Sequence, residues 1–234
     1  MGGEPSAQSS NHYASSATSG AFSPRAVERI TNTGEEYIRH MRLSKTEILE
    51  YFGREDRNYR LAMLCTHWIR DTAHFTPSAI SQAKSLWMKV AGRTIAFSDL
   101  AAELEDVNRR EIISSQFLLT HLRALVRVPF ELLKDYCEDF DKTAAQPFLM
   151  DKLKKTPWFE YTRLVRNAVS HNFRFAFDKN DRAKLPVAWN GITIDGSHDK
   201  KEITYETLWH RPGYELFLEM KDFADSLPEP VERP

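Results

Sequence analysis

The sequence predicts a mostly α-helical protein, an up-and-down helical bundle with a small β-hairpin between its last two helices. Three observations support this fold class. Apolar residues recur at helical spacing over most of residues 44–172. Capping and helix-breaking residues divide that pattern into separate segments. One later stretch, about residues 187–206, is instead rich in β-branched and aromatic residues, with turn residues in its middle.

The chain is predicted to consist of an arm and one domain. Residues 1–24 are rich in Ser, Ala, Gly and Asn, lack a periodic apolar pattern and are expected to be disordered. Residues 25–230 are expected to form a single helical domain, which is long enough to bury a core. The sequence shows neither a signal-peptide pattern nor an apolar run of membrane-spanning length. We therefore expect a cytoplasmic protein that does not bind a membrane.

Overall charge and cysteine content exclude several classes of protein. The 32 basic and 33 acidic residues give a formal net charge of -1, so any nucleic-acid surface must be local. Cys65 and Cys137 lack CxxC partners, which argues against a structural zinc site and fits a reducing compartment. Patterns typical of nucleotide, zinc or serine hydrolases are absent from the sequence. We expect no metal and no cofactor.

The first helices are predicted from caps and apolar spacing. One helix is expected over about residues 25–41. Ser44 and Glu47 form a capping-box pattern before a short helix that ends near Gly53. A longer helix follows, and its inward face is predicted at Leu61, Leu64, Cys65, Trp68 and Ile69. Residues 78–90 are expected to form the next helix.

The central part of the chain predicts two more helices. Ser98 is expected to cap a long helical segment that continues to about Phe140 and that Pro129 kinks or divides. Thr156-Pro157 predicts the start of a central helix that reaches about Asn172. The inward stripe of the long segment is predicted at Ile112, Ile113, Gln116, Phe117, Leu119, Leu122 and Val126.

The hairpin and the last helix complete the domain. The hairpin is predicted to pair VAWNGITI with KKEITYE across the turn residues DGSHD. The last helix is expected over about residues 207–227, with its start disturbed by Pro212-Gly213. Its inward residues are predicted to be Leu208, Phe217, Leu218, Met220 and Phe223.

The segment with the clearest chemistry is Arg166-Asn167-Ala168-Val169-Ser170-His171. Residues 152–174 hold six basic residues and one acidic residue, a local excess that attracts anions. The arrangement resembles the motif of the HEPN superfamily, in which an arginine, often followed by a polar residue, precedes a histidine by a few positions on a late helix. The resemblance covers about residues 40–227, and its specific signal lies in these six residues.

The chemistry of these side chains suits a phosphodiester. Asn167 and His171 lie four residues apart and so share a helix face with Arg163, and Arg166 and Ser170 flank that face. An arginine fork can hold two phosphate oxygens and stabilise charge that develops at phosphorus. Histidine titrates near neutral pH, so it can accept or donate a proton. RNA supplies its own nucleophile, the 2′-hydroxyl, so no metal is needed.

The HEPN resemblance implies a metal-independent endoribonuclease that leaves a 2′,3′-cyclic phosphate and acts in defence, toxin–antitoxin or stress systems. It implies a homodimer with a composite cleft, RNA as substrate, and an antitoxin or regulatory protein as a further partner. Arg166 and His171 would be the catalytic pair, with Asn167 in support. Phe173 stands where one toxin branch has a modified tyrosine, which argues against that regulation. The residues expected to bind RNA phosphates are Arg163, Ser170, Arg174, Lys154 and Lys155.

Other interpretations of the same residues remain open. Arg166 and His171 could belong to an ordinary exposed helix face, in a non-catalytic HEPN module that binds RNA, a nucleotide or a protein, or in a structural helical adaptor. Cys65, His67 and His74 are poorly spaced for a metal site. The acidic run 131–141 is expected to be a solvated helix end or one edge of the cleft. The aromatic residues Trp158, Tyr161 and Phe173 could stack on bases, but aromatic residues at helical spacing are more often part of the core.

Overall fold

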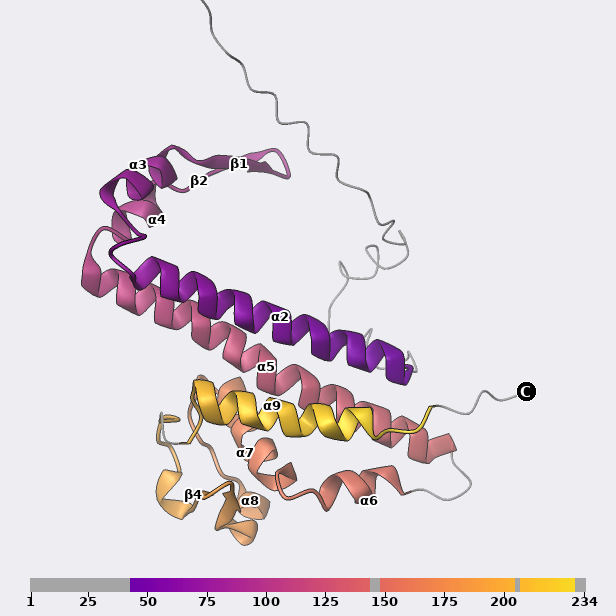
Figure 1. Cartoon of the computed structure of the whole chain (residues 1–234). Helices are drawn as coiled ribbons and strands as arrows, with labels where there is room; N and C mark the ends of the chain where they lie inside the picture. Colours follow the sequence, from indigo (N-terminus) through magenta and orange to yellow (C-terminus); the bar gives the residue numbers. More distant parts are fainter. Residues whose placement is uncertain (1–42, 144–147, 205–206, 230–234) are drawn as a thin grey trace, which may run out of the picture. The chain divides into compact units, whose positions relative to one another are not determined.

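The computed structural model describes residues 43–143, 148–204 and 207–229 (Figure 1). The predicted arm (1–24) and the predicted helix over 25–41 lie outside these residues. The elements, labelled as in Figure 1, are α2 (Lys45–Arg70), α3 (Pro77–Ser85), β1 (Trp87–Val90), β2 (Arg93–Ala96), α4 (Ser98–Glu103), α5 (Val107–Thr143), α6 (Leu149–Lys154), α7 (Phe159–Ser170), α8 (Lys179–Lys184), β3 (Val187–Trp189), β4 (Ile192–Ile194), a 3-10 helix (Gly196–His198) and α9 (His210–Asp225). The mostly α-helical fold with a small hairpin between its last two helices, α8 and α9, is confirmed.

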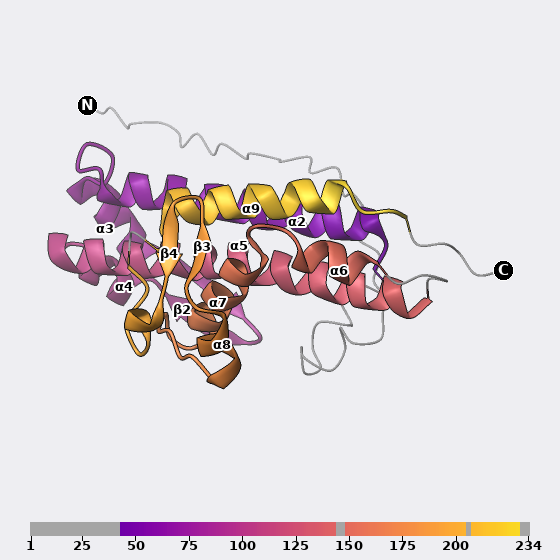
Figure 2. The ribbon, with the colours of Figure 1, turned by 90° about the horizontal axis from the view of Figure 1, so that it is seen from below.

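Helix α5 is the helix on which the core is built. Helices α2, α6, α7 and α9 all pack against it, and Figure 2 shows α9 and α6 along its length. Full burial of a Leu, Val or Phe side chain contributes roughly 1.5–3 kcal/mol, so this face accounts for much of the driving force. Pro129 lies inside a continuous α5, so the expected division of the helix there is wrong. The buried face of α5 includes Leu118, Leu122, Leu125, Val126, Phe130 and Leu133.

Helix α2 begins as predicted but buries a different face. The Ser44 hydroxyl accepts a hydrogen bond from the Glu47 amide at 3.1 Å, and the Glu47 carboxylate accepts one from the Ser44 amide at 2.8 Å. The helix then continues through Gly53, so the expected end there is wrong. Three residues of the predicted inward face are exposed: Leu61 at 59%, Leu64 at 47% and Trp68 at 55%. The buried seam is instead Ile48, Phe52, Glu55, Tyr59, Ala62 and Thr66.

The reason lies in the partners of α2. The buried positions are spaced alternately by four and three residues, which keeps one narrow seam turned toward neighbouring helices. The Phe52 ring packs 5.5 Å from Phe217, and the Tyr59 ring stacks 6.1 Å from Tyr214, both on α9. The second half of this seam, with Tyr59, Ala62 and Thr66, is therefore buried although the neighbouring exposed stripe of Leu61, Leu64 and Trp68 is more apolar.

The segment after α3 forms a hairpin that the sequence analysis missed. Residues 78–90 were expected to be helical, but the helix ends at Ser85 and β1 pairs with β2 in antiparallel register. The turn residues Ala91 and Gly92 have φ values of 49° and 78°, the left-handed conformation that a two-residue hairpin turn requires. Turn geometry therefore overrides the helical apolar spacing in this segment.

The predicted second hairpin is shorter than expected. Asn190 and Gly191 have φ values of 48° and 76°, so VAWNGITI itself turns back and forms both β3 and β4. The described residues of the expected second strand, 200–204, do not pair with it. The amide of Ile203 donates to the carbonyl of Phe173 at 2.7 Å, so that segment runs beside the residues that follow α7.

Several helix starts also differ from expectation. Ser98 does not cap α4, because the N-cap is Phe97 and no side chain caps this end. Helix α7 begins at Phe159 rather than at Thr156-Pro157, and the Thr156 hydroxyl donates instead to the carbonyl of Leu153 at 2.8 Å. In α9, Pro212 is accommodated in the first turn, where its missing N–H is not needed. Leu218 is 43% exposed, whereas the other predicted inward residues of this segment are buried.

Gly213 in α9 is packed against the core. An added Cβ would lie 2.6 Å from Cδ1 of Leu122, a side chain that is fully buried and cannot move freely. We expect Gly213→Ala to lower the free energy of unfolding by about 1–3 kcal/mol, the usual cost of overpacking. Urea denaturation would measure it, with Gly196→Ala as the control because that position has open space. Equal stabilities of the two variants would contradict this packing.

None of the helices in the described ranges combines the length and the apolar character that crossing a membrane requires.

Candidate functional site

A pocket of about 540 Å³ opens beside the predicted motif. Four helices, α5, α6, α7 and α8, contribute side chains to it, which explains why it could not be seen in one segment of sequence. Its lining includes three apolar residues, five basic residues and two acidic residues. The lining residues are Phe130, Lys134, Glu138, Met150, Lys154, Phe159, Glu160, Arg163, Arg166, Asn167 and Lys184.

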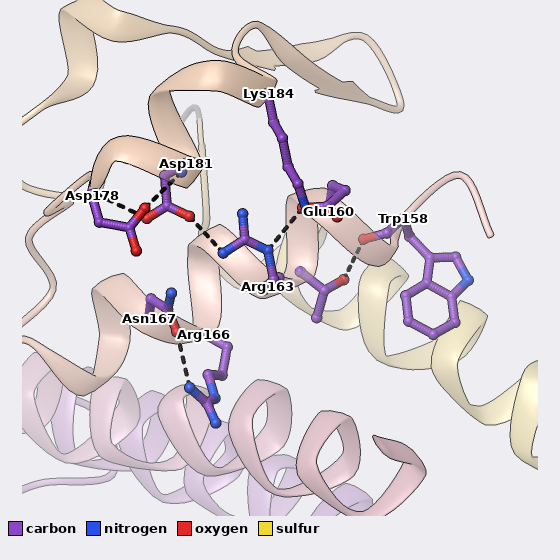
Figure 3. Close-up of polar contacts among 9 residues, drawn as sticks. Trp158, Glu160, Arg163, Arg166, Asn167, Asp178, Asp181 and Lys184 are labelled. Atoms are coloured by element: carbon purple, nitrogen blue, oxygen red, sulfur yellow. Dashed lines mark hydrogen bonds and ion pairs between the residues drawn. The ribbon is translucent and has the colours of Figure 1, made fainter. Parts of the chain in front are cut away.

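Arg163 is held by two carboxylates (Figure 3). Its Nε lies 2.8 Å from Glu160 and its Nη1 lies 2.6 Å from Asp181, a buried residue of α8. Burial alone would lower the pKa of Arg163, but the hydrogen bonds that it donates to these two carboxylates raise it. Its Nη2 is buried and has no hydrogen-bond partner in the described part of the chain. Arg163 therefore connects α7 to α8, and its Nη2 group makes no hydrogen bond to a described residue.

Arg166 extends from α7 toward α5 and is less well compensated (Figure 3). Its Nη1 donates to Oδ1 of Asn167 at 2.9 Å, and its Nη2 forms an ion pair with Glu131 of α5. Burial, followed by the neighbouring positive charge of Arg127, lowers the pKa of Arg166. Its Nε is buried without a partner among the described residues. An additional anion in the pocket would therefore stabilise this guanidinium.

His171 lies at the end of α7, outside the pocket lining. It is the C-cap residue, its side chain is exposed, and its amide donates to the carbonyls of Asn167 and Ala168. Within the described ranges its imidazole makes no hydrogen bond or ion pair. The next two residues, Asn172 and Phe173, have φ values of 55° and 58°. Such backbone is uncommon for a bulky residue, and it ends the helix abruptly at the histidine.

The structure thus brings together some of the predicted site residues and separates others. Arg163, Arg166, Asn167 and Lys154 line one pocket. Four residues of the predicted set, namely Ser170, His171, Lys155 and Arg174, do not. The hydroxyl of Ser170 is buried and has no partner among the described residues, while Arg174 is exposed and forms an ion pair with Glu202 at 2.6 Å. Trp158 and Tyr161 are buried in the core and are not available to stack on a base.

Several pocket residues were not predicted. Lys134 and Lys184 add positive charge from α5 and α8, and Asp181 forms an ion pair with Arg163. Glu138, which lines the pocket, and Glu131, which pairs with Arg166, both come from the acidic run 131–141. No local signal marks these residues, because each is separated from the motif along the chain and meets it only after the helices pack.

Glu160 makes the stability of the site dependent on pH. Burial would raise its pKa, but hydrogen bonds from Lys184 at 2.6 Å and Arg163 at 2.8 Å lower it. A lowered folded-state pKa means that this stabilisation is present above the ordinary glutamate pKa of about 4.3 and is lost as the pH falls below it. We expect Glu160→Gln to cost on the order of 1–2 kcal/mol at pH 7 and much less near pH 3.

The measurement is chemical denaturation of both proteins at each pH. Glu50→Gln is the control, because Glu50 is exposed on α2 and lies outside the pocket. A cost of Glu160→Gln that is the same at both pH values would contradict the ion-pair account.

Comparisons with protein-family models, with curated proteins and with solved structures find no match. The resemblance to the HEPN superfamily therefore depends on the motif in α7 and its helical setting. Within the described ranges, no three His, Cys, Asp or Glu side chains are grouped in a way that could hold a metal ion.

Proposed function

We propose that the protein is a metal-independent endoribonuclease whose site is centred on Arg166, Asn167 and His171. The observation that carries this proposal is the state of Arg166. It lies in a pocket with a surplus of basic residues, its pKa is lowered by burial and by Arg127, and one of its donors is buried without a partner. A phosphate group in the pocket would add a second negative charge beside this guanidinium, and an arginine fork is well suited to hold phosphate oxygens.

The proposed reaction needs only RNA and these side chains. The 2′-hydroxyl oxygen attacks phosphorus, the bond from phosphorus to the 5′-oxygen breaks, and the products are a 2′,3′-cyclic phosphate and a 5′-hydroxyl. The proton lost by the 2′-oxygen is balanced by the proton gained at the 5′-oxygen, and His171 exchanges one of them with the RNA. Arg166 stabilises the charge that builds on the phosphate oxygens, and Asn167 orients the Arg166 fork.

The position of His171 sets a condition on this mechanism. Because the imidazole is exposed and lies outside the pocket lining, RNA must extend from the pocket across the end of α7 to reach it. The resemblance offers a second route, a homodimer in which the histidine of one copy meets the pocket of the other. The expected partners are RNA, a second copy and an antitoxin or regulatory protein, and the expected location is the cytoplasm.

A second candidate function is a non-catalytic module that binds RNA, a nucleotide or a partner protein. One observation favours it. Carboxylates already contact both arginines, Glu160 and Asp181 for Arg163 and Glu131 for Arg166. A pocket that keeps its arginines in place in this way can hold an anion without carrying out chemistry on it.

Glu131 is predicted to compete with RNA for Arg166. Glu131→Gln removes a negative charge beside the guanidinium, and we expect RNA affinity to rise several-fold at low salt. Fluorescence anisotropy with a labelled single-stranded RNA would measure it, again with Glu50→Gln as the control. Affinity that falls, while the thermal melt is unchanged, would instead make Glu131 a positioning residue for Arg166.

The proposal is tested by incubating the purified full chain with a varied RNA pool in EDTA. The expected result is cleavage that survives chelation and leaves cyclic phosphate ends. Binding without any cleavage would favour the module. Absence of both binding and cleavage by folded protein would leave the structural adaptor as the best interpretation.

A further inference from the structure

Exposed apolar side chains gather at one end of the α2–α5 pair. Fifteen large hydrophobic side chains are exposed in the described part of the chain, and thirteen of them lie between Leu61 and Phe117. We call residues 61–117 the apolar end; it comprises the last turns of α2, then α3, β1, β2, α4 and the first turns of α5 (Figure 1). The thirteen residues are Leu61, Met63, Leu64, Trp68, Leu86, Trp87, Met88, Val90, Ile95, Leu100, Val107, Ile112 and Phe117.

The β1–β2 hairpin is the least covered element of the apolar end. All eight of its strand residues are exposed, including Trp87 at 63%. The two strands pair only with each other among the described strands, so both outer edges keep unpaired backbone groups. A two-stranded hairpin without packing on a face is marginally stable in water, so this one is expected to need a covering surface.

We infer that the apolar end is the surface through which two copies of this chain associate. Large side chains of this kind have areas of about 200 Å², so thirteen of them, each roughly half exposed, offer about 1,300 Å² of apolar surface. A standard interface takes about 800 Å² from each partner, so the apolar end is large enough for a stable pair. A monomer rarely exposes so much apolar surface at one end.

The balanced charge of the apolar end favours a second copy of the chain over a strongly basic or strongly acidic partner. Residues 61–117 hold six basic and six acidic residues, so two apolar ends do not repel each other. Lys89 and Arg93 on the hairpin make no ion pair within the described ranges, and Asp99 on α4 is exposed with only Ser98 as a partner. In a two-fold pair, the hairpin of each copy can meet the acidic α4 of the other. The same surface therefore carries both the basic and the acidic residues that would pair across a two-fold interface.

This inference goes beyond the proposed function and differs from a composite cleft. The pocket lining and the apolar end share no residue. Along α5, Phe117 and the Arg166 partner Glu131 are separated by fourteen residues, or about 20 Å at the helical rise. Association through the apolar end therefore leaves each Arg166 pocket outside the interface.

The test is sedimentation velocity of the full chain over about 1–100 µM, where weak interfaces of standard size dissociate. We expect a dimer that Leu64→Glu and Trp87→Glu each weaken at least tenfold. Leu218→Glu is the matched control, because Leu218 is 43% exposed, close to the 47% of Leu64, but lies on α9 outside the apolar end. Circular dichroism and thermal melts verify that the variants fold. Hydrogen exchange of the β1–β2 amides should slow as protein concentration rises.

Three results would overturn the inference. The first is a monomer at every concentration with unprotected hairpin amides. The second is a monomer whose hairpin amides are protected throughout, which would assign the apolar end to residues 1–42 of the same chain. The third is a dimer that both patch variants leave intact, which would place the interface elsewhere. RNA is absent from this experiment. A monomer would remove the homodimer route to His171, but RNA cleavage is tested separately and could still be observed.

Discussion

Replacement of His171 by alanine is expected to abolish RNA cleavage while leaving RNA binding intact. A positioned acid or base contributes about 10²–10⁴ to a rate, so the rate of cleavage should fall by that factor. Binding should persist because His171 does not line the pocket and its imidazole holds no other side chain among the described residues. The measurement is single-turnover cleavage beside anisotropy with an RNA of the same sequence.

His67→Ala provides the control for this prediction, because His67 is an exposed histidine on α2 far along the chain from the motif. Its cleavage rate should equal that of the wild type. Wild-type cleavage by His171→Ala would remove the histidine from the mechanism. A loss of binding together with cleavage would make His171 part of the RNA surface rather than the group that moves a proton.

Replacement of Arg166 should lower both binding and cleavage. Arg166→Ala removes the planar fork and the charge, and charge-assisted hydrogen bonds contribute about 1.5–3 kcal/mol each, so RNA affinity should fall roughly 10- to 100-fold. Arg166→Lys should restore little, because an ammonium group cannot reproduce the bidentate geometry or the hydrogen bond to Asn167. Anisotropy over a range of salt concentrations would show the slope of the salt dependence reduced by about one phosphate contact.

The matched control for Arg166 is Arg211→Ala. Arg211 is an exposed arginine on α9 that forms an ion pair with Glu215 at 2.8 Å. Its loss should change RNA binding little. Thermal melts are needed for Arg166→Ala, because Glu131 would lose its partner. Full RNA affinity in a folded Arg166→Ala protein would contradict the pocket as the phosphate site and would place RNA binding on another surface.

Local signals in the sequence predicted several elements well. The Ser44 capping box and the apolar positions of α9 depend on neighbours within a few residues, and the structure confirms them except at Leu218. Asn190-Gly191 had a strong turn signal that should have placed the whole hairpin within residues 187–194. Ala91-Gly92 between two apolar runs was a weaker signal of the same kind, and it was outweighed by helical spacing.

The sequence alone could not predict which of two apolar faces of a helix is buried. Helix α2 carries two apolar stripes, and only packing against α5 and α9 decides that Tyr59 and Ala62 are buried while Leu64 and Trp68 are exposed. The same limit applies to the site. The motif identified Arg166 and Asn167, but the Arg166 partner Glu131 and the pocket residue Lys184 come from other helices. Such tertiary neighbours have no fixed spacing from the motif.

The most direct test of the central claim compares two oligonucleotides of one sequence in EDTA, the first an RNA and the second carrying 2′-O-methyl groups throughout. Both present the same phosphates to the Arg166 pocket, but only the RNA has a free 2′-hydroxyl. The account predicts that both bind and that only the RNA is cleaved, with cyclic phosphate ends. Cleavage of the 2′-O-methyl oligonucleotide, or cleavage of RNA only after a divalent metal is added, would contradict it.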